Sequence, residues 1–116
     1  MTSKTKPEIT IKLGGKSYAM RPTFEAVRNA ENALGIGFLK IAEQYFEQRL
    51  TVGEMTAVIH AAISTGKARA PAIEKVGQLL VDGGIAECVA PLGEFISDVL
   101  TDPDQEPDPQ SPEEAG

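Results

Sequence analysis

A Gly-Gly pair between two strand-like segments constrains this chain more than any other feature. Apolar and polar residues alternate through 9–13, and after Gly14 and Gly15 the segment 16–21 reads as a second strand. Two-residue hairpin turns need positive φ at their centre, which glycine adopts without steric cost. The sequence therefore predicts a β-hairpin over residues 8–21.

The length of this turn fixes the register of the hairpin. Residue 13 should pair with 16, 11 with 18, and 9 with 20, so that one face carries only apolar side chains. The opposite face should pair Glu8 with Arg21. Apolar cross-strand pairs and an opposite-charge pair thus arise from a single register. Because an isolated two-stranded hairpin is barely stable, we expect its apolar face to pack on helices.

After Pro22 the spacing of apolar residues becomes that of α-helices. The first predicted helix has Thr23 as its N-cap and Gly35 as its left-handed stop. Its stripe consists of Phe24, Val27, Ala30, Glu31 and Leu34. A second helix follows Gly37 and has a wide apolar stripe at helical spacing. This stripe consists of Phe38, Ile41, Ala42, Tyr45 and Phe46.

Three further helices are predicted. Thr51 and Glu54 have the spacing of a capping box, which opens a third helix that runs to Gly66. A short basic loop follows, and Pro71 suits the first turn of a fourth helix that ends at Gly83-Gly84. The last helix spans about 85–100, and Pro91 should kink it or split it in two. The predicted class is α+β, with an N-terminal β-hairpin packed on a cluster of four to five short α-helices.

The net charge of −6 lies entirely on the C-terminal end of the chain. Residues 101–116 contain six acids, no base, four of the eight prolines and a single hydrophobic residue. Such a segment cannot offset its ordering entropy by apolar burial. With 116 residues we predict one domain over 8–101, a flexible N-terminus over 1–7, and a disordered acidic Pro-rich tail over 102–116. Whether the tail solubilises the protein or attracts a basic partner stays open.

Composition argues against several functional classes. Outside the tail the acids and bases are equal, at 11 each, whereas nucleic-acid-binding domains show a basic surplus. The single cysteine excludes an internal disulfide framework. There is no apolar run of the ~20 residues that a membrane span requires, nor a signal-peptide stretch. We therefore expect a cytoplasmic protein with neither nucleic acid nor membrane as a partner.

No residue pattern predicts catalysis, a cofactor or a metal site. His60 is the only imidazole and is expected at the surface or boundary of the third helix, while Cys88 reads as a small buried hydrophobe. Gly14-Gly15-Lys16 lacks the spacing of a phosphate-binding loop. Glu31 shares the apolar side of its helix, so we expect it to be partly buried and bonded to Arg28 or a helix terminus.

The second helix carries half of the aromatic residues of the chain. Its stripe is either core packing or one wall of a groove for a partner helix, and both interpretations stay open. In the second case the anchors would come from the second and third helices. The candidate partner-binding residues are Phe38, Ile41, Tyr45, Phe46 and Met55.

The order and spacing of these elements resemble the small tail-assembly-chaperone family of gene transfer agents and related tailed phages. The resemblance covers residues 8–100, and the motifs that carry it follow in chain order. They are Leu13-Gly14-Gly15, Tyr18, Arg21-Pro22-Thr23-Phe24, Glu31, Leu34-Gly35, Leu50-Thr51, Ile63 to Gly66, and Val81-Asp82-Gly83-Gly84-Ile85.

The resemblance implies a non-enzymatic role in a bacterial host. Proteins of this kind are encoded between the tail-tube and tape-measure genes, bind and solubilise the tape measure protein during tail assembly, and are absent from the finished particle. The tail tube protein is a second expected partner, and self-association stays open. Two other hypotheses remain: a structural tail component retained in the particle, and a small nucleic-acid-binding regulator.

Overall fold

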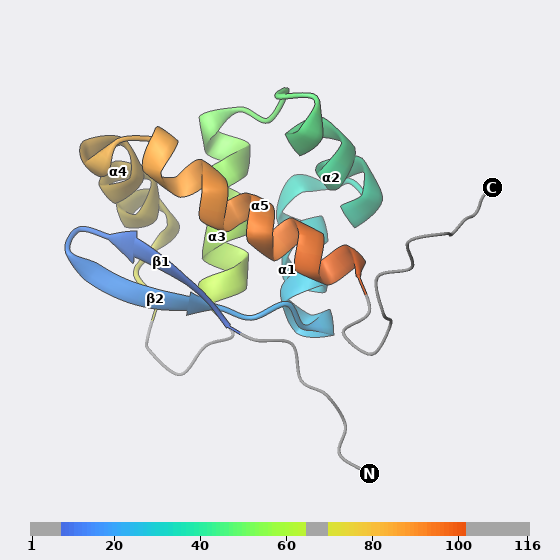
Figure 1. The fold of residues 1–116 in the computed structure, drawn as a ribbon, viewed down its shortest axis with the longest axis horizontal. Helices are drawn as coiled ribbons and strands as arrows, with labels where there is room; N and C mark the ends of the chain where they lie inside the picture. The colour runs from blue at the N-terminus through green and yellow to red at the C-terminus, as the bar shows by residue number, and fades with distance from the viewer. Residues whose placement is uncertain (1–7, 65–69, 102–116) are drawn as a thin grey trace, which may run out of the picture.

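The computed structural model describes residues 8–64 and 70–101 (Figure 1). The elements are β1 Ile9–Leu13, β2 Lys16–Met20, α1 Phe24–Leu34, α2 Phe38–Phe46, α3 Val52–Ile63, α4 Ile73–Gly83 and α5 Ala86–Leu100. A hairpin followed by five helices confirms the predicted α+β class. The predictions for residues 1–7, for the stop at Gly66 with its basic loop, and for 102–116 lie outside the described residues.

The hairpin has the predicted register. Ile9 pairs with Met20, Ile11 with Tyr18 and Leu13 with Lys16, in an antiparallel ladder whose apolar face is buried. The turn residues have φ values of 62° at Gly14 and 82° at Gly15, as the turn requires. Glu8 and Arg21 form the predicted ion pair.

The hairpin turn packs against α4. A Cβ atom on Gly14 would lie 2.7 Å from a Leu79 methyl carbon, so a side chain there would have to displace Leu79 as well as adopt a positive φ. The apolar face of the hairpin rests on three helices, since β1 contacts α4 and α5 while β2 contacts α3. The two-stranded sheet thus covers one side of the helical cluster, as Figure 1 shows.

Helix α3 lies at the centre of the core, between α1 and α4. Seven of its twelve residues are buried, and even its threonine, Thr56, is covered and donates its hydroxyl to the Val52 carbonyl at 2.8 Å. The capping box that opens this helix is present in both directions, between the Thr51 and Glu54 side chains and backbones. The sequence motif is confirmed.

In α1 the capping predictions are confirmed, but the placement of Phe24 on the core-facing stripe is wrong. Thr23 caps the helix by accepting a hydrogen bond from Ala26 at 3.1 Å, and Gly35 has the left-handed φ of 74°. Phe24 is 77% exposed, however, and Ala26 is buried in its place. Side chains two positions apart on an α-helix point ~200° apart around its axis. Because Ala26 faces the core, Phe24 points away from it.

Two predictions near prolines need correction. Pro71 lies just before the extended N-cap Ala72 rather than in the first turn of α4. Pro91 does not split the last helix, because α5 is continuous from Ala86 to Leu100, while the alternative that it kinks the helix stays a prediction. Loss of one amide donor is outweighed there by burial of the residues that follow Pro91, among them the fully buried Phe95.

Candidate functional site

Helix α2 is attached to α1 through an acidic side chain. Gly37, its N-cap, has no side chain to satisfy the free amides of the first turn. The carboxylate of Glu31 replaces it and accepts a hydrogen bond from the Phe38 amide at 2.8 Å. The prediction that Glu31 bonds to a helix terminus is confirmed, and a negative charge at this end of α2 also suits the helix dipole.

The stripe of α2 divides into a buried and an exposed part. Phe38, Ile41 and Ala42 are buried, and the Phe38 ring meets Phe95 of α5 edge-to-face with centroids 6.2 Å apart. Phe38 and Ile41 are therefore core residues in the described structure, unlike the exposed side chains expected of anchors, and their contact with a partner stays a prediction. The second interpretation, one wall of a groove, applies only to the end of the helix, where Phe46 is 57% exposed.

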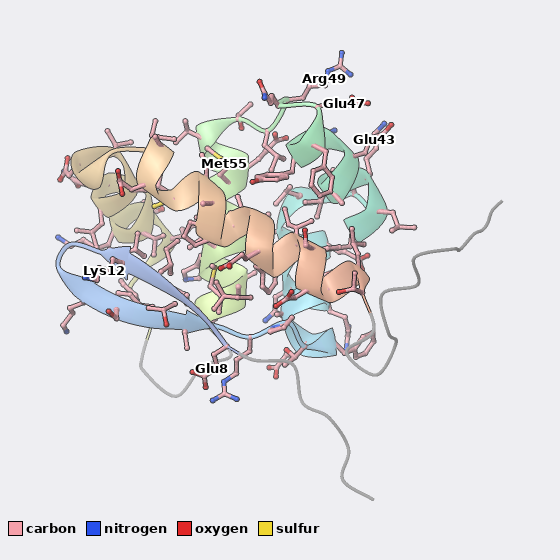
Figure 2. The ribbon with its side chains drawn as sticks, in the orientation of Figure 1. Glu8, Lys12, Glu43, Glu47, Arg49 and Met55 are labelled. Carbon is pink, nitrogen blue, oxygen red and sulfur yellow. The ribbon has the colours of Figure 1, made fainter. Side chains whose placement is uncertain are left out.

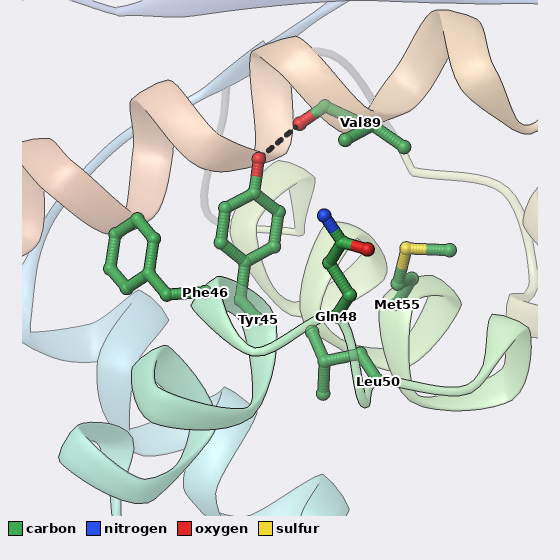
Figure 3. Close-up of a pocket in the computed structure, with 6 residues that line it drawn as sticks. All are labelled: Tyr45, Phe46, Gln48, Leu50, Met55 and Val89. Atoms are coloured by element: carbon green, nitrogen blue, oxygen red, sulfur yellow. Dashed lines mark hydrogen bonds between the residues drawn. The ribbon is translucent and has the colours of Figure 1, made fainter.

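Tyr45 joins the exposed end of α2 to α5. Its hydroxyl donates a hydrogen bond to the Val89 backbone carbonyl at 2.9 Å, which Figure 3 shows as a dashed line. The ring lies against Gly93, where a Cβ atom would overlap the hydroxyl oxygen and lie 2.9 Å from the ring carbon that bears it. The absence of a side chain at Gly93 thus makes room for this contact.

A left-handed residue ends α2. Gln48 has a φ of 60°, and it is the only non-glycine residue with positive φ among the residues the structure describes. The Gln48 amide bonds to the Tyr45 carbonyl at 3.0 Å and the Arg49 amide to the Gln44 carbonyl at 2.7 Å, which is the pattern of a Schellman motif. Glycine normally occupies this position, so no residue pattern predicted the motif.

These features surround a groove of about 580 Å³ between α2, α3 and α5 (Figure 3). Its volume falls in the ~300–1,000 Å³ range typical of ligand-binding clefts. It is mainly lined by apolar side chains, and we call it the α2–α5 groove. The lining residues are Tyr45, Phe46, Gln48, Leu50, Met55 and Val89.

Three of the five predicted partner-binding residues meet in this groove. Tyr45, Phe46 and Met55 all line it. Met55 is 9% exposed and Phe46 is 57% exposed. Sequence reasoning missed Val89 and Leu50 as lining residues and Gln48 altogether. Their contribution depends on how α5 crosses the end of α2, which no local pattern reports. That these residues bind a partner stays a prediction.

Cys88 and His60 are the two side chains that the sequence analysis considered for chemistry. Cys88 is buried, and desolvation, followed by the nearby charge of Glu87, raises the pKa of its thiol, so the reactive thiolate is disfavoured. His60 is half-buried in the last turn of α3. Within the described ranges, no three His, Cys, Asp or Glu side chains gather in a way that could hold a metal ion.

The described structure is therefore a small α+β domain whose candidate site is an apolar groove at the junction of three helices. The chain belongs to the family described as phage tail tube protein, GTA-gp10, whose model matches residues 6–102. No curated protein and no solved structure matches it. In the parts of the chain that the structure covers, none of the helices has the length and apolarity to cross a membrane.

Membership in this family establishes a phage tail-related protein, in agreement with the resemblance found in the sequence. The family is a structural one, which is consistent with the expected non-enzymatic role. Its description names the tail tube rather than an assembly chaperone. Family membership therefore shows a tail-related protein but does not by itself show that the protein is an assembly chaperone.

Proposed function

We propose that this protein is a tail assembly chaperone that binds helical segments of the tape measure protein and keeps them soluble until the tail tube encloses them. The observation that carries the proposal is the α2–α5 groove, an open apolar site on a domain of a phage tail family. A long chain of apolar helices exposed before assembly needs such sites, because each exposed stripe favours aggregation.

The surface of α2 supports transient binding of this kind. Phe46 at the groove and Leu39 two turns earlier are both exposed, at 57% and 75%. Burial of apolar surface is worth about 25 cal/mol per Å², so covering side chains of this size supplies several kcal/mol before the cost of association. Because the cost of association offsets much of this burial free energy, the net affinity suits a partner that must later be released.

Coexpression with the tape measure protein of the same gene cluster tests the proposal. We expect the tape measure protein to be soluble and to copurify with this chain, and to precipitate when it is expressed alone. A tape measure protein that stays insoluble in the presence of this chain, at equal expression, would contradict a chaperone function.

A second candidate is a structural component of the tail that remains in the particle. The family description, which names a tail tube protein, favours this alternative. Quantitative mass spectrometry of purified particles separates the two functions. Stoichiometric amounts of the chain in finished particles would support the structural role, whereas its absence from particles that assemble only when it is expressed would support the chaperone.

A further inference from the structure

We infer that the outer edge of β2 pairs with the same edge of a second copy of this chain, so that two hairpins form one continuous antiparallel sheet. Within the described residues the sheet of a single copy consists of β1 and β2 alone, so each strand has one edge without a neighbouring strand. None of the residues that line the α2–α5 groove belongs to β2, and the pairing therefore does not depend on the proposed function.

The register of the hairpin decides which backbone groups of β2 point outward. Residue pairs in an antiparallel ladder alternate between pairs that exchange hydrogen bonds and pairs that do not. Leu13 and Lys16, which flank the two-residue turn, form a pair of the first kind. Counted from that pair, Ser17 and Ala19 direct their amides and carbonyls away from β1. Among the described residues, these outward groups have no hydrogen-bond partner.

The two edges of the hairpin differ in how they are protected against pairing. Natural sheet edges are commonly blocked by a lysine, a proline or a bulge. On β1 the outward positions are Thr10 and Lys12, and Figure 2 shows the charged side chain of Lys12 on this strand. On β2 the outward positions are Ser17 and Ala19, which are small and uncharged. The register has no bulge, so β2 presents the unprotected edge.

The packing of the helices also favours the edge of β2. Helices α4 and α5 both contact β1, whereas the helix that contacts β2 most is α3. In Figure 1, β1 runs between β2 and α5, and β2 lies on the side of the hairpin away from α4 and α5. A further strand can therefore approach β2 from the side opposite to β1.

One register makes β2 complementary to itself. A two-fold axis through Tyr18 places Ser17 of one copy opposite Ala19 of the other, and in this register the outward amides and carbonyls of both copies meet. Lys16 then lies opposite Met20 of the other copy. No two like charges within residues 16–20 lie directly opposite each other, so no cross-strand repulsion opposes the pairing.

A second copy suits this edge better than other extended segments. Residues 102–116 of the chain itself contain four prolines, which have no amide to donate to a ladder. An unfolded segment of another protein would lose conformational entropy as it became a strand. In a second copy, β2 is already extended, because its ladder with β1 and the burial of Tyr18 and Met20 hold it in place. A strand that is already ordered loses little entropy when it pairs.

The short length of the edge makes the dimer a transient one. β2 has five residues, which corresponds to about 17 Å of extended chain. Interfaces that bury less than about 1,200 Å² in total are typical of weak complexes. We therefore expect a dissociation constant of roughly 10–100 μM.

Sedimentation velocity of the full-length protein tests the pairing over a concentration range of about 5–500 μM. We expect the weight-average sedimentation coefficient to rise with concentration from the value of a monomer toward that of a dimer. A protein that stays monomeric over the whole range would overturn the inference.

Proline substitutions on the two edges are matched variants. Ala19→Pro removes an outward amide from β2, and Thr10→Pro removes the outward amide of its cross-strand partner on β1, so neither breaks a hydrogen bond of the hairpin ladder. We expect Ala19→Pro to weaken the dimer at least about tenfold, and Thr10→Pro to change its affinity less than about threefold. Circular dichroism checks that both variants are folded. Equal losses in the two variants, or an unchanged dimer in Ala19→Pro, would overturn the assignment to the β2 edge.

Two charged double variants test the register without introducing proline. Ser17→Glu places an acid opposite Lys12 within the hairpin, so it suits the fold of both variants. Combined with Ala19→Glu it sets acids against acids across the two-fold axis, and combined with Ala19→Lys it sets acids against lysines. We expect the first combination to weaken the dimer about fivefold or more and the second to tighten it about threefold at low salt. Equal affinities of the two double variants would overturn the proposed register.

Discussion

The hydroxyl of Tyr45 and the backbone carbonyl of Val89 lie 2.9 Å apart and form the hydrogen bond that joins α2 to α5. Both residues line the groove, so one contact both fixes the relative position of two helices and shapes the candidate site. Phe38, Ile41 and Ala42 hold the first part of α2 in the core, and this bond ties the last turn of the helix to α5.

Gly93→Ala should disturb this contact. The added methyl would overlap the Tyr45 hydroxyl oxygen, so we expect the bond to Val89 to be lost and groove binding to fall about tenfold. Equilibrium urea unfolding should show a net cost of about 1–2 kcal/mol, despite the better helix propensity of alanine. Gly83→Ala is the control: no atom lies within 4 Å of the new methyl, and stability should rise slightly or stay unchanged. Equal effects of the two substitutions would contradict the packing argument.

Phe46→Ala should reduce binding without unfolding the domain. Phe46 is 57% exposed, so we expect a loss of stability below about 1 kcal/mol but a loss of affinity of about tenfold or more for the bound helix. Phe24→Ala removes an even more exposed aromatic side chain, at the start of α1. It should leave the affinity unchanged, and parallel titrations with thermal melts of both variants measure the difference. Similar losses of affinity in both variants would contradict the groove as the binding site.

Gln48→Gly should stabilise the protein. The left-handed conformation costs a side-chain-bearing residue about 1–2 kcal/mol, and glycine avoids this cost while adding some entropy to the unfolded chain. We expect a net gain of roughly 0.5–1 kcal/mol in urea unfolding. Gln44→Gly, in the helical part of α2, should instead cost about 1 kcal/mol. A destabilised Gln48→Gly variant would show that the side chain contributes more to stability than its conformation costs.

The buried thiol predicts a pH dependence at the alkaline end. Burial raises the pKa of Cys88 above its ordinary value of 9.0, so the folded state keeps the proton that the unfolded chain loses first. The stability that this contributes is complete below pH 9 and falls as the pH rises through the folded pKa. Unfolding measured from pH 8 upward should show this loss, and Cys88→Ala should lack it. An identical slope in the variant would assign the effect to other groups.

Part of the candidate site could be predicted from the sequence. The stripe on α2 and the position of Met55 identified Tyr45, Phe46 and Met55, which line the groove. The same stripe could not separate Phe46 from Phe38, because periodicity gives the apolar face of a helix but not how far a neighbour covers it. Phe38 is covered by Phe95, a residue of α5 that is distant in the chain.

The sequence by itself determined the local features. The Gly14-Gly15 turn with its register, the capping box at Thr51, and the stop at Gly35 each depend on residues within a few positions of one another, so their conformations follow from local sterics and hydrogen bonding. Only the tertiary structure decided that Phe24 is exposed, that Gln48 takes a glycine-like conformation and that Val89 completes a groove. Those outcomes depend on how the helices cross, which is set by the packing of the whole core.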